Sequence, residues 1–165
     1  MTHLTIFYHA TKITDAIQCL RNGGHHVSAI MLAYAAIDQM AWLSIPDEKS
    51  HGKDFKAWVN KYILSKNNIG CTADELWAAR NGLLHMGTAE SSAHQSGVTI
   101  KKIFYSVGNV LPMEHKKDII YLKSETLIDA YISGVMSFIA ELEYDTSQLS
   151  IALDKINRTL TLRGL

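Results

Sequence analysis

The residues that most constrain the fold of this chain are the apolar ones from Ala29 to Ile37, inside a longer segment from His26 to Leu43. They are apolar almost all round a helix, and Asp38 is the sole charge between Ala29 and Leu43. A helix that is apolar on every side needs protein neighbours on every side. The sequence therefore predicts a buried central helix over about 26–43, with other helices packed around it.

Further segments repeat the helical spacing of apolar residues, and only two prolines, Pro46 and Pro112, interrupt the chain. The glycine pair Gly23-Gly24 is expected to end the first helix. Ser124 is expected to cap a helix whose apolar stripe continues to Leu142. The other helices are expected over residues 4–21, 52–65, 72–87 and 146–162.

Two segments break this helical pattern. Residues 98–107 and 118–122 are rich in β-branched and aromatic side chains, and Gly108, Asn109 and Pro112 lie between them. Turn residues between two such runs indicate a β-hairpin. The expected fold is therefore a single domain over residues 1–165, an antiparallel helical bundle of the all-α class with one β-hairpin inserted at about 98–122.

Composition narrows the classes of protein. Basic and acidic residues both number 16, so the net charge is zero. This excludes a nucleic-acid binder held by global charge, although a local basic patch remains possible. The cysteines, Cys19 and Cys71, lack the spacing of a zinc ribbon and fit a reducing compartment. Without a signal-peptide pattern or an apolar run long enough for a bilayer, we expect a cytoplasmic protein with no membrane contact.

The helix expected over residues 72–87 carries an unusual charge. Thr72 and Glu75 form a capping-box pattern at its start, and Gly87 is a suitable left-handed stop. Arg80 projects into the middle of the apolar stripe of this helix. Burying a guanidinium without a partner is costly, so Arg80 needs an acid, an opening to solvent or an anionic ligand. We expect Asp38 and Arg80 to approach each other across facing helices.

The residues alone leave two interpretations of Arg80 and His85 open. An arginine and an aspartate inside a bundle are often a satisfied polar pair, and a histidine at a helix end is often a partner of the helix dipole. Arg80 and His85 are also about 140° apart on an ideal helix. Acting together would require a bent helix end, an arginine side chain that wraps around the helix, or a second subunit.

Arg80, Asn81 and His85 also form a motif. Arg-Asn, three residues and His resemble the R-polar-x-x-x-H signature of the HEPN superfamily (higher eukaryotes and prokaryotes nucleotide-binding domains). The order of segments before it, an apolar helix ending at Asp38 and then residues 54–62, is similar to small bacterial HEPN proteins over roughly the first half of the chain. The resemblance implies a helical bundle that dimerises. For many members it implies a metal-independent endoribonuclease of toxin–antitoxin or phage-defence systems, with two motif copies in one cleft.

The resemblance also implies roles for these residues. Arg80 and His85 match the catalytic pair, and Asn81 matches the polar position that helps to set the site. Such a site cleaves RNA when the 2′-hydroxyl attacks the adjacent phosphate, with His85 as general acid or base and Arg80 on the phosphate oxygens. Asp38 would orient Arg80. No metal or other cofactor is expected.

Lysines near the expected hairpin suggest additional contacts to RNA. Together with Phe104 and Tyr105, they could contact phosphates and stack on bases, although an ordinary solvated hairpin is the favoured explanation. The lysines are Lys101, Lys102, Lys116, Lys117 and Lys123.

Three functions therefore remain open at this point. They are an endoribonuclease, a non-catalytic HEPN-fold nucleotide- or RNA-binding or interaction module, and a structural helical dimer in which Arg80 is merely paired. The expected partners are RNA, a second copy of the chain and an antitoxin or another protein of the same system.

Overall fold

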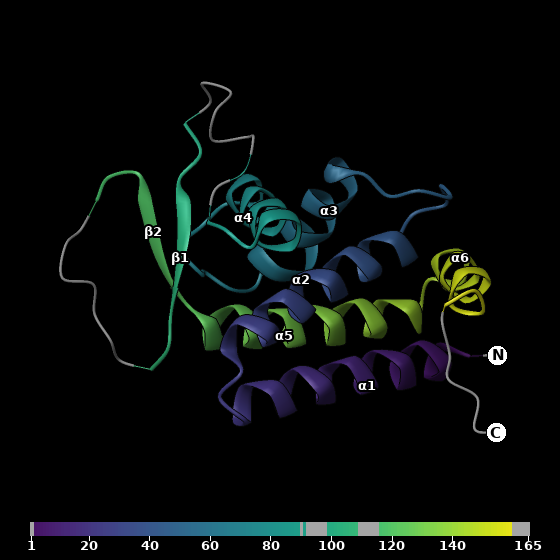
Figure 1. Cartoon of the computed structure of the whole chain (residues 1–165). Helices are drawn as coiled ribbons and strands as arrows, with labels where there is room; N and C mark the ends of the chain where they lie inside the picture. Colours follow the sequence, from purple (N-terminus) through teal and green to yellow (C-terminus); the bar gives the residue numbers. More distant parts are fainter. Residues whose placement is uncertain (1, 90, 92–98, 109–115, 160–165) are drawn as a thin grey trace.

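Helices make up most of the chain. The computed structural model describes residues 2–89, 91, 99–108 and 116–159. Within them the mostly helical class is confirmed (Figure 1). The helices are α1 (His3–Asn22), α2 (His26–Leu43), α3 (Gly52–Trp58), a π-helix η1 (Val59–Leu64), α4 (Ala73–Met86), α5 (Ser124–Leu142) and α6 (Thr146–Ile156). The strands are β1 (Lys102–Ser106) and β2 (Ile119–Lys123).

Helix α2 lies at the centre of the bundle, as its apolar sequence predicts. It packs against α1, α3, α4, α5 and α6. Ala29, Ala33 and Ile37 have no exposed surface at all. Around it, α1 and α5 run side by side, α6 lies at one end of the molecule and the two strands lie at the other (Figure 1). None of the helices in the described part of the chain is long and apolar enough to cross a membrane.

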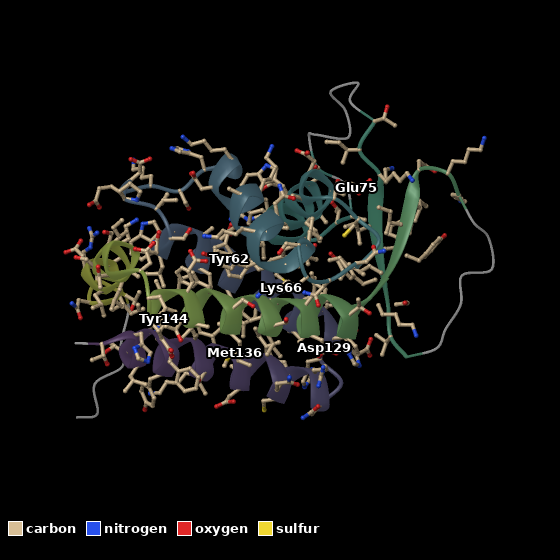
Figure 2. The ribbon with its side chains drawn as sticks, turned by 180° about the vertical axis from the view of Figure 1, so that it is seen from behind. Tyr62, Lys66, Glu75, Asp129, Met136 and Tyr144 are labelled. Atoms are coloured by element: carbon tan, nitrogen blue, oxygen red, sulfur yellow. The ribbon has the colours of Figure 1, made fainter. Side chains whose placement is uncertain are left out.

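Both ends of α4 have the geometry that their residues predict. The Thr72 hydroxyl accepts from the Glu75 N–H at 3.2 Å, and a Glu75 carboxylate oxygen accepts from the Thr72 N–H at 2.8 Å. Gly87 has φ 64°, the left-handed conformation that glycine adopts most easily, and its N–H bonds back to the helix. Glu75 lies at the end of the molecule that carries the strands (Figure 2). These caps fix the position of α4 and of the motif on it.

The predicted β-hairpin is wrong, because β1 and β2 are parallel. Residue 102 pairs with 119 and residue 106 with 123, and the Lys102 N–H donates to the Asp118 carbonyl at 2.9 Å. The first residue of β2 therefore lies beside the first residue of β1 and not beside its last. A parallel pair needs a crossover of about a dozen residues, and the connection over residues 107–118 provides that length.

Three element boundaries differ from those predicted. The helix expected over 52–65 changes to π-helical geometry at Val59, where it packs closely on α5: a Cβ on Gly134 would lie 3.2 Å from the Tyr62 carbonyl oxygen (Figure 2). Lys123, not Ser124, is the N-cap of α5, because β2 continues directly into the helix. Helix α6 ends at Ile156, where tight backbone turns close it; residues 160–162 of its expected range lie outside the described residues.

Candidate functional site

Asp38 and Arg80 meet across α2 and α4, so the predicted ion pair is confirmed. Arg80 Nε donates to Asp38 Oδ2 at 2.7 Å, and Arg80 Nη2 lies 2.6 Å from the same oxygen. The Arg80 side chain is 19% exposed and the Asp38 side chain is 25% exposed. The arginine in the apolar stripe therefore has the carboxylate that its burial requires.

Arg80 also reaches His85 and Asn81. Its Nη1 lies 3.0 Å from His85 Nε2 and donates to Asn81 Oδ1 at 3.0 Å. Helix α4 remains α-helical through all three residues. Of the three ways to bring Arg80 and His85 together, the structure shows the wrapping of the arginine side chain around the helix.

The hydrogen bonds of Arg80 define the state of His85. A guanidinium only donates, so His85 Nε2 must accept, and the imidazole in this arrangement is neutral with its proton on Nδ1. An arginine side chain has five N–H groups. The Nε–H and one N–H of Nη2 point to Asp38, and the two N–H groups of Nη1 point to Asn81 and His85, so four are used. Within residues 2–89, 91, 99–108 and 116–159, no acceptor occupies the second N–H of Nη2.

Burial raises the pKa of the Asp38 carboxyl above its ordinary value, while the hydrogen bond and the charge of Arg80 act in the opposite direction and offset only part of this. A lower dielectric disfavours the charged form of an acid, and an adjacent cation favours it. Asp38 therefore takes up a proton more readily than a surface aspartate does. Its protonation would weaken its hold on Arg80.

Trp77 is part of the site as well, although the sequence motif does not include it. The Arg80 guanidinium carbon lies 5.2 Å from the centre of the Trp77 ring, within the range of a cation–π contact. The ring also packs closely on α3, where a Cβ on Gly52 would come within 2.8 Å of it. The signal was the spacing of three residues between Trp77 and Arg80, which places them on neighbouring positions of a helix surface.

The site opens to solvent at His85. This residue is exposed, whereas Asp38, Arg80 and Asn81 are half-buried. An acid–base group at the surface, held by a half-buried cation, can meet a substrate from solution. A motif pointing into a sealed core would instead have favoured a purely structural role.

Asp38, Arg80, Asn81 and His85 form one cluster, the Arg80 cluster, on α2 and α4. Lys101 and Lys102 do not lie on either of these helices. Lys101 is exposed just before β1, and Lys102 is the first residue of that strand. Tyr105, expected to stack on bases, points toward the core, where its hydroxyl shares a short hydrogen bond with that of Tyr34. Tyr34 lies one turn before Asp38 on α2, so the inner side of β1 is tied to the helix that holds the ion pair.

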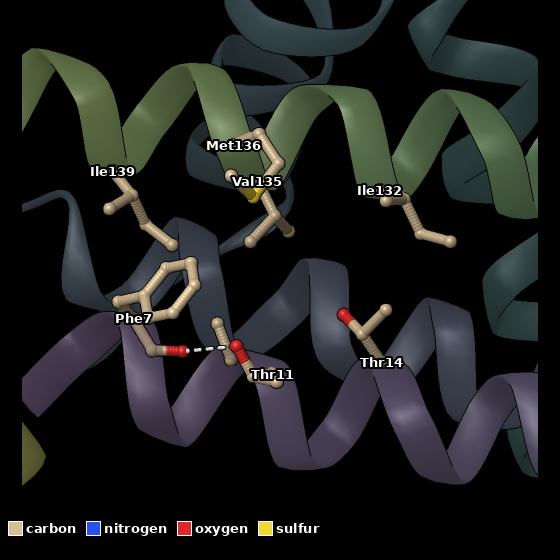
Figure 3. Close-up of a pocket in the computed structure, with 8 residues that line it drawn as sticks. Phe7, Thr11, Thr14, Ile132, Val135, Met136 and Ile139 are labelled. Carbon is tan, nitrogen blue, oxygen red and sulfur yellow. Dashed lines mark hydrogen bonds between the residues drawn. The ribbon is translucent and has the colours of Figure 1, made fainter. Parts of the chain in front are cut away.

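A groove elsewhere on the molecule offers no comparable chemistry. It lies between α1 and α5, measures about 220 Å³, and is lined mainly by apolar side chains such as Phe7, Val135 and Met136 (Figure 3). The Thr11 hydroxyl beside this groove donates to the Phe7 carbonyl oxygen of its own helix. Nor do any three His, Cys, Asp or Glu side chains among the described residues gather as a metal site would require.

Comparisons with known protein families, with curated proteins and with solved structures find no match to this chain.

Proposed function

We propose that this chain is a metal-independent endoribonuclease of toxin or phage-defence type, with a HEPN-like fold. One observation carries the proposal: a half-buried arginine, anchored by Asp38, lies 3.0 Å from the nitrogen of an exposed histidine. The pair combines a fixed cation for phosphate with an acid–base group open to solvent. Cleavage of RNA by attack of its own 2′-hydroxyl uses both.

The contacts suggest how substrate would engage the pair. A phosphate oxygen entering beside Arg80 finds one N–H of Nη2 and competes with His85 for Nη1. When His85 is displaced from Nη1, its Nε2 lone pair becomes available to the 2′-hydroxyl. Phosphate binding would thus release the base at the place where it is needed.

The reaction follows from these positions. His85 Nε2 takes the proton of the 2′-hydroxyl, and the 2′-oxygen forms a bond to phosphorus while the bond to the 5′-oxygen breaks. Arg80 stabilises the charge that develops on the phosphate oxygens. The leaving 5′-oxygen takes a proton from a second acid. The products are a 2′,3′-cyclic phosphate and a 5′-hydroxyl.

The proposal includes a homodimer in the cytoplasm, in which His85 of a second copy supplies that acid. It also includes RNA as substrate and an antitoxin or neighbouring-system protein as a regulatory partner. Lys101 and Lys102 add contacts to the RNA backbone. Light scattering on the purified protein tests the dimer: a monomer at every concentration that supports cleavage contradicts it.

One observation favours the alternative of a non-catalytic nucleotide- or RNA-binding or interaction module. Asp38, Asn81 and His85 already hold the Arg80 guanidinium, and only one of its N–H groups has no acceptor among the residues that the structure describes. A cluster closed in this way is also what a structural ion pair would show. Activity separates the two functions.

The decisive experiment incubates the purified protein with RNA in EDTA and compares it with Arg80→Ala and His85→Ala. Loss of an acid–base residue lowers rates by about 100-fold or more. We expect both variants to lose cleavage to that extent, and the wild-type products to end in 2′,3′-cyclic phosphate. The matched controls are Arg21→Ala, which loses a surface ion pair with Asp129, and His3→Ala, which loses a pairing with Glu143.

Two results contradict the proposal. If the wild type cleaves no RNA, the endoribonuclease assignment fails and the binding module remains. If the wild type cleaves and both motif variants match it, the site lies elsewhere on the chain.

A further inference from the structure

The two strands present one face to the core and one to the outside. Ile103, Tyr105, Ile120 and Leu122 pack against the core of the bundle. Because side chains alternate along a strand and paired residues of a ladder share a face, the other positions form an outer face. The residues of this outer face are Lys102, Phe104, Ser106, Ile119, Tyr121 and Lys123.

An aromatic pair lies at the middle of the outer face. Phe104 pairs with Tyr121 in the parallel register, their ring centres are 6.3 Å apart, and Phe104 is 40% exposed. An antiparallel hairpin would have brought different residues opposite each other. The parallel register is therefore what places these two rings together on one side of the sheet.

Lysines lie at both ends of the aromatic pair. Lys102 pairs with Ile119 at one end of the outer face, and Lys123 pairs with Ser106 at the other. At about 3.3 Å per residue, the two ends are roughly 13 Å apart along the strands. Lys101, Lys116 and Lys117 are exposed beside the strands as well.

Two carboxylates moderate this positive charge. Asp118 is exposed before β2, and Glu125 follows β2 at the start of α5. Glu125 accepts from the Gly108 N–H at 3.4 Å and from the Ser124 hydroxyl at 3.1 Å. Among the described residues, five lysines and these two carboxylates therefore lie on or next to the strands.

We propose that the outer face of the two strands is a docking platform for single-stranded RNA, with bases on Phe104 and Tyr121 and phosphates beside Lys102 and Lys123. Aromatic rings next to lysines suit a strand whose base faces are unpaired, because a duplex keeps its bases stacked inside. The sheet is connected to α2 by the hydrogen bond between the Tyr105 and Tyr34 hydroxyls, and to α4 by the packing of β1 against that helix. In its choice of RNA, this inference rests on the proposed endoribonuclease function.

A binding experiment tests the platform separately from cleavage. The His85→Ala chain, which keeps the whole sheet, is titrated into a short fluorescein-labelled single-stranded RNA without self-complementarity, and anisotropy gives the Kd. Stacking of one base on an aromatic ring is worth about 1–3 kcal/mol, so Phe104→Val and Tyr121→Val should each weaken binding by about 5- to 100-fold. Phe104→Tyr should retain binding, since it keeps the ring.

Charge and strand state provide further readouts. Lys123→Gln should lower the slope of log Kd against log salt by about one, as the loss of one phosphate contact does. The same sequence as a duplex should bind more weakly than the single strand. Tyr144→Ala is the matched control, because Tyr144 is 86% exposed in the turn between α5 and α6 and should leave the Kd unchanged.

The platform is overturned if valine variants with wild-type melting temperatures bind RNA with the wild-type Kd, if Tyr144→Ala weakens binding equally, or if single-stranded DNA of the same sequence binds more tightly than the RNA. These outcomes are independent of activity. A chain that binds through Phe104 and Tyr121 but does not cleave supports the platform and contradicts the endoribonuclease. A chain that cleaves through Arg80 and His85 with valine variants of unchanged Kd does the reverse.

Discussion

Lys155 and Arg80 are two largely hidden cations of the described residues, and their surroundings differ. Lys155, on α6, is 2% exposed, and its Nζ donates to the main-chain carbonyls of Trp42, Ile45 and Asp47 at 2.7, 2.5 and 2.8 Å. Arg80 is 19% exposed and is held by the side chains of Asp38, Asn81 and His85. Both cations are therefore shielded from solvent, but Lys155 is held by main-chain carbonyls and Arg80 by side chains.

The difference shows what makes a buried charge a candidate site. An ammonium has three N–H groups, and the three carbonyls at the end of α2 and in the loop after it use all of them. Main-chain carbonyls neither titrate nor swing away, so Lys155 holds the loop and is available for nothing else. The partners of Arg80 are side chains, one of which can exchange a proton with a substrate. The following experiments measure the contrast through stability.

The largest effect is expected at Lys155. Lys155→Met keeps an unbranched side chain but leaves three carbonyls without their donor, and an unsatisfied buried group costs about 1–3 kcal/mol. We expect a loss of about 3 kcal/mol in the free energy of unfolding, measured by urea denaturation. The control is Lys61→Met, which removes an exposed lysine paired with Glu141 and should change stability by less than about 1 kcal/mol. A loss at Lys155 no larger than that at Lys61 would show that the carbonyl contacts contribute nothing.

The next largest effect is expected at Asp38. Asp38→Ala leaves the Arg80 guanidinium half-buried without its carboxylate; breaking a fully buried pair costs about 3–5 kcal/mol, and partial exposure reduces this here to about 2 kcal/mol. Asp129→Ala, which removes the surface partner of Arg21, is the matched control and should cost less than about 1 kcal/mol. A double variant, Asp38→Ala with Arg80→Met, should be less destabilised than the two single losses combined. Strict additivity would mean that the pair does not couple.

The two cations also differ in how much of them the sequence predicts. Asp38 and Arg80 are each a charged residue in an apolar helical stripe. Because the charges are opposite and each needs a partner when buried, the sequence predicts that they pair. Lys155 lies in the last turn of an amphipathic helix, where a lysine is ordinary. Its burial depends on where the loop after α2 places its carbonyls, and no side-chain pattern records the position of main-chain groups.

The strands show the same limit. Their β-branched and aromatic residues identify the two segments as strands, but the direction in which the strands pair is not contained in the local pattern of either segment. The wrong direction then leads to the wrong partner for Phe104 and conceals Tyr121. The caps of α4 were predicted correctly because they depend only on residues within the helix and next to it, such as Thr72, Glu75 and Gly87.

The third effect concerns pH. The pKa of Asp38 is raised in the folded chain above the ordinary 3.8. At pH values between 3.8 and this raised pKa, the folded chain therefore binds more protons than the unfolded chain. Stability of the wild type relative to Asp38→Asn should therefore increase as the pH falls from neutral toward 3.8, by about 1.4 kcal/mol for each unit of pKa difference. Thermal denaturation of both proteins across this range measures it. A wild type that instead loses stability relative to Asp38→Asn would show that the attraction of Arg80 outweighs burial.

The smallest effect on stability is expected at His85, the most exposed member of the Arg80 cluster. His85→Ala removes an imidazole that lies in solvent, while Asp38 and Asn81 still hold the guanidinium, so the free energy of unfolding should change by less than about 0.5 kcal/mol. The same substitution should remove RNA cleavage under the proposed function. At Lys155 the expected order is reversed: a large loss of stability, with cleavage per folded molecule unchanged. A His85→Ala protein as unstable as Lys155→Met would assign His85 a structural role, and the contrast between the two buried cations would disappear.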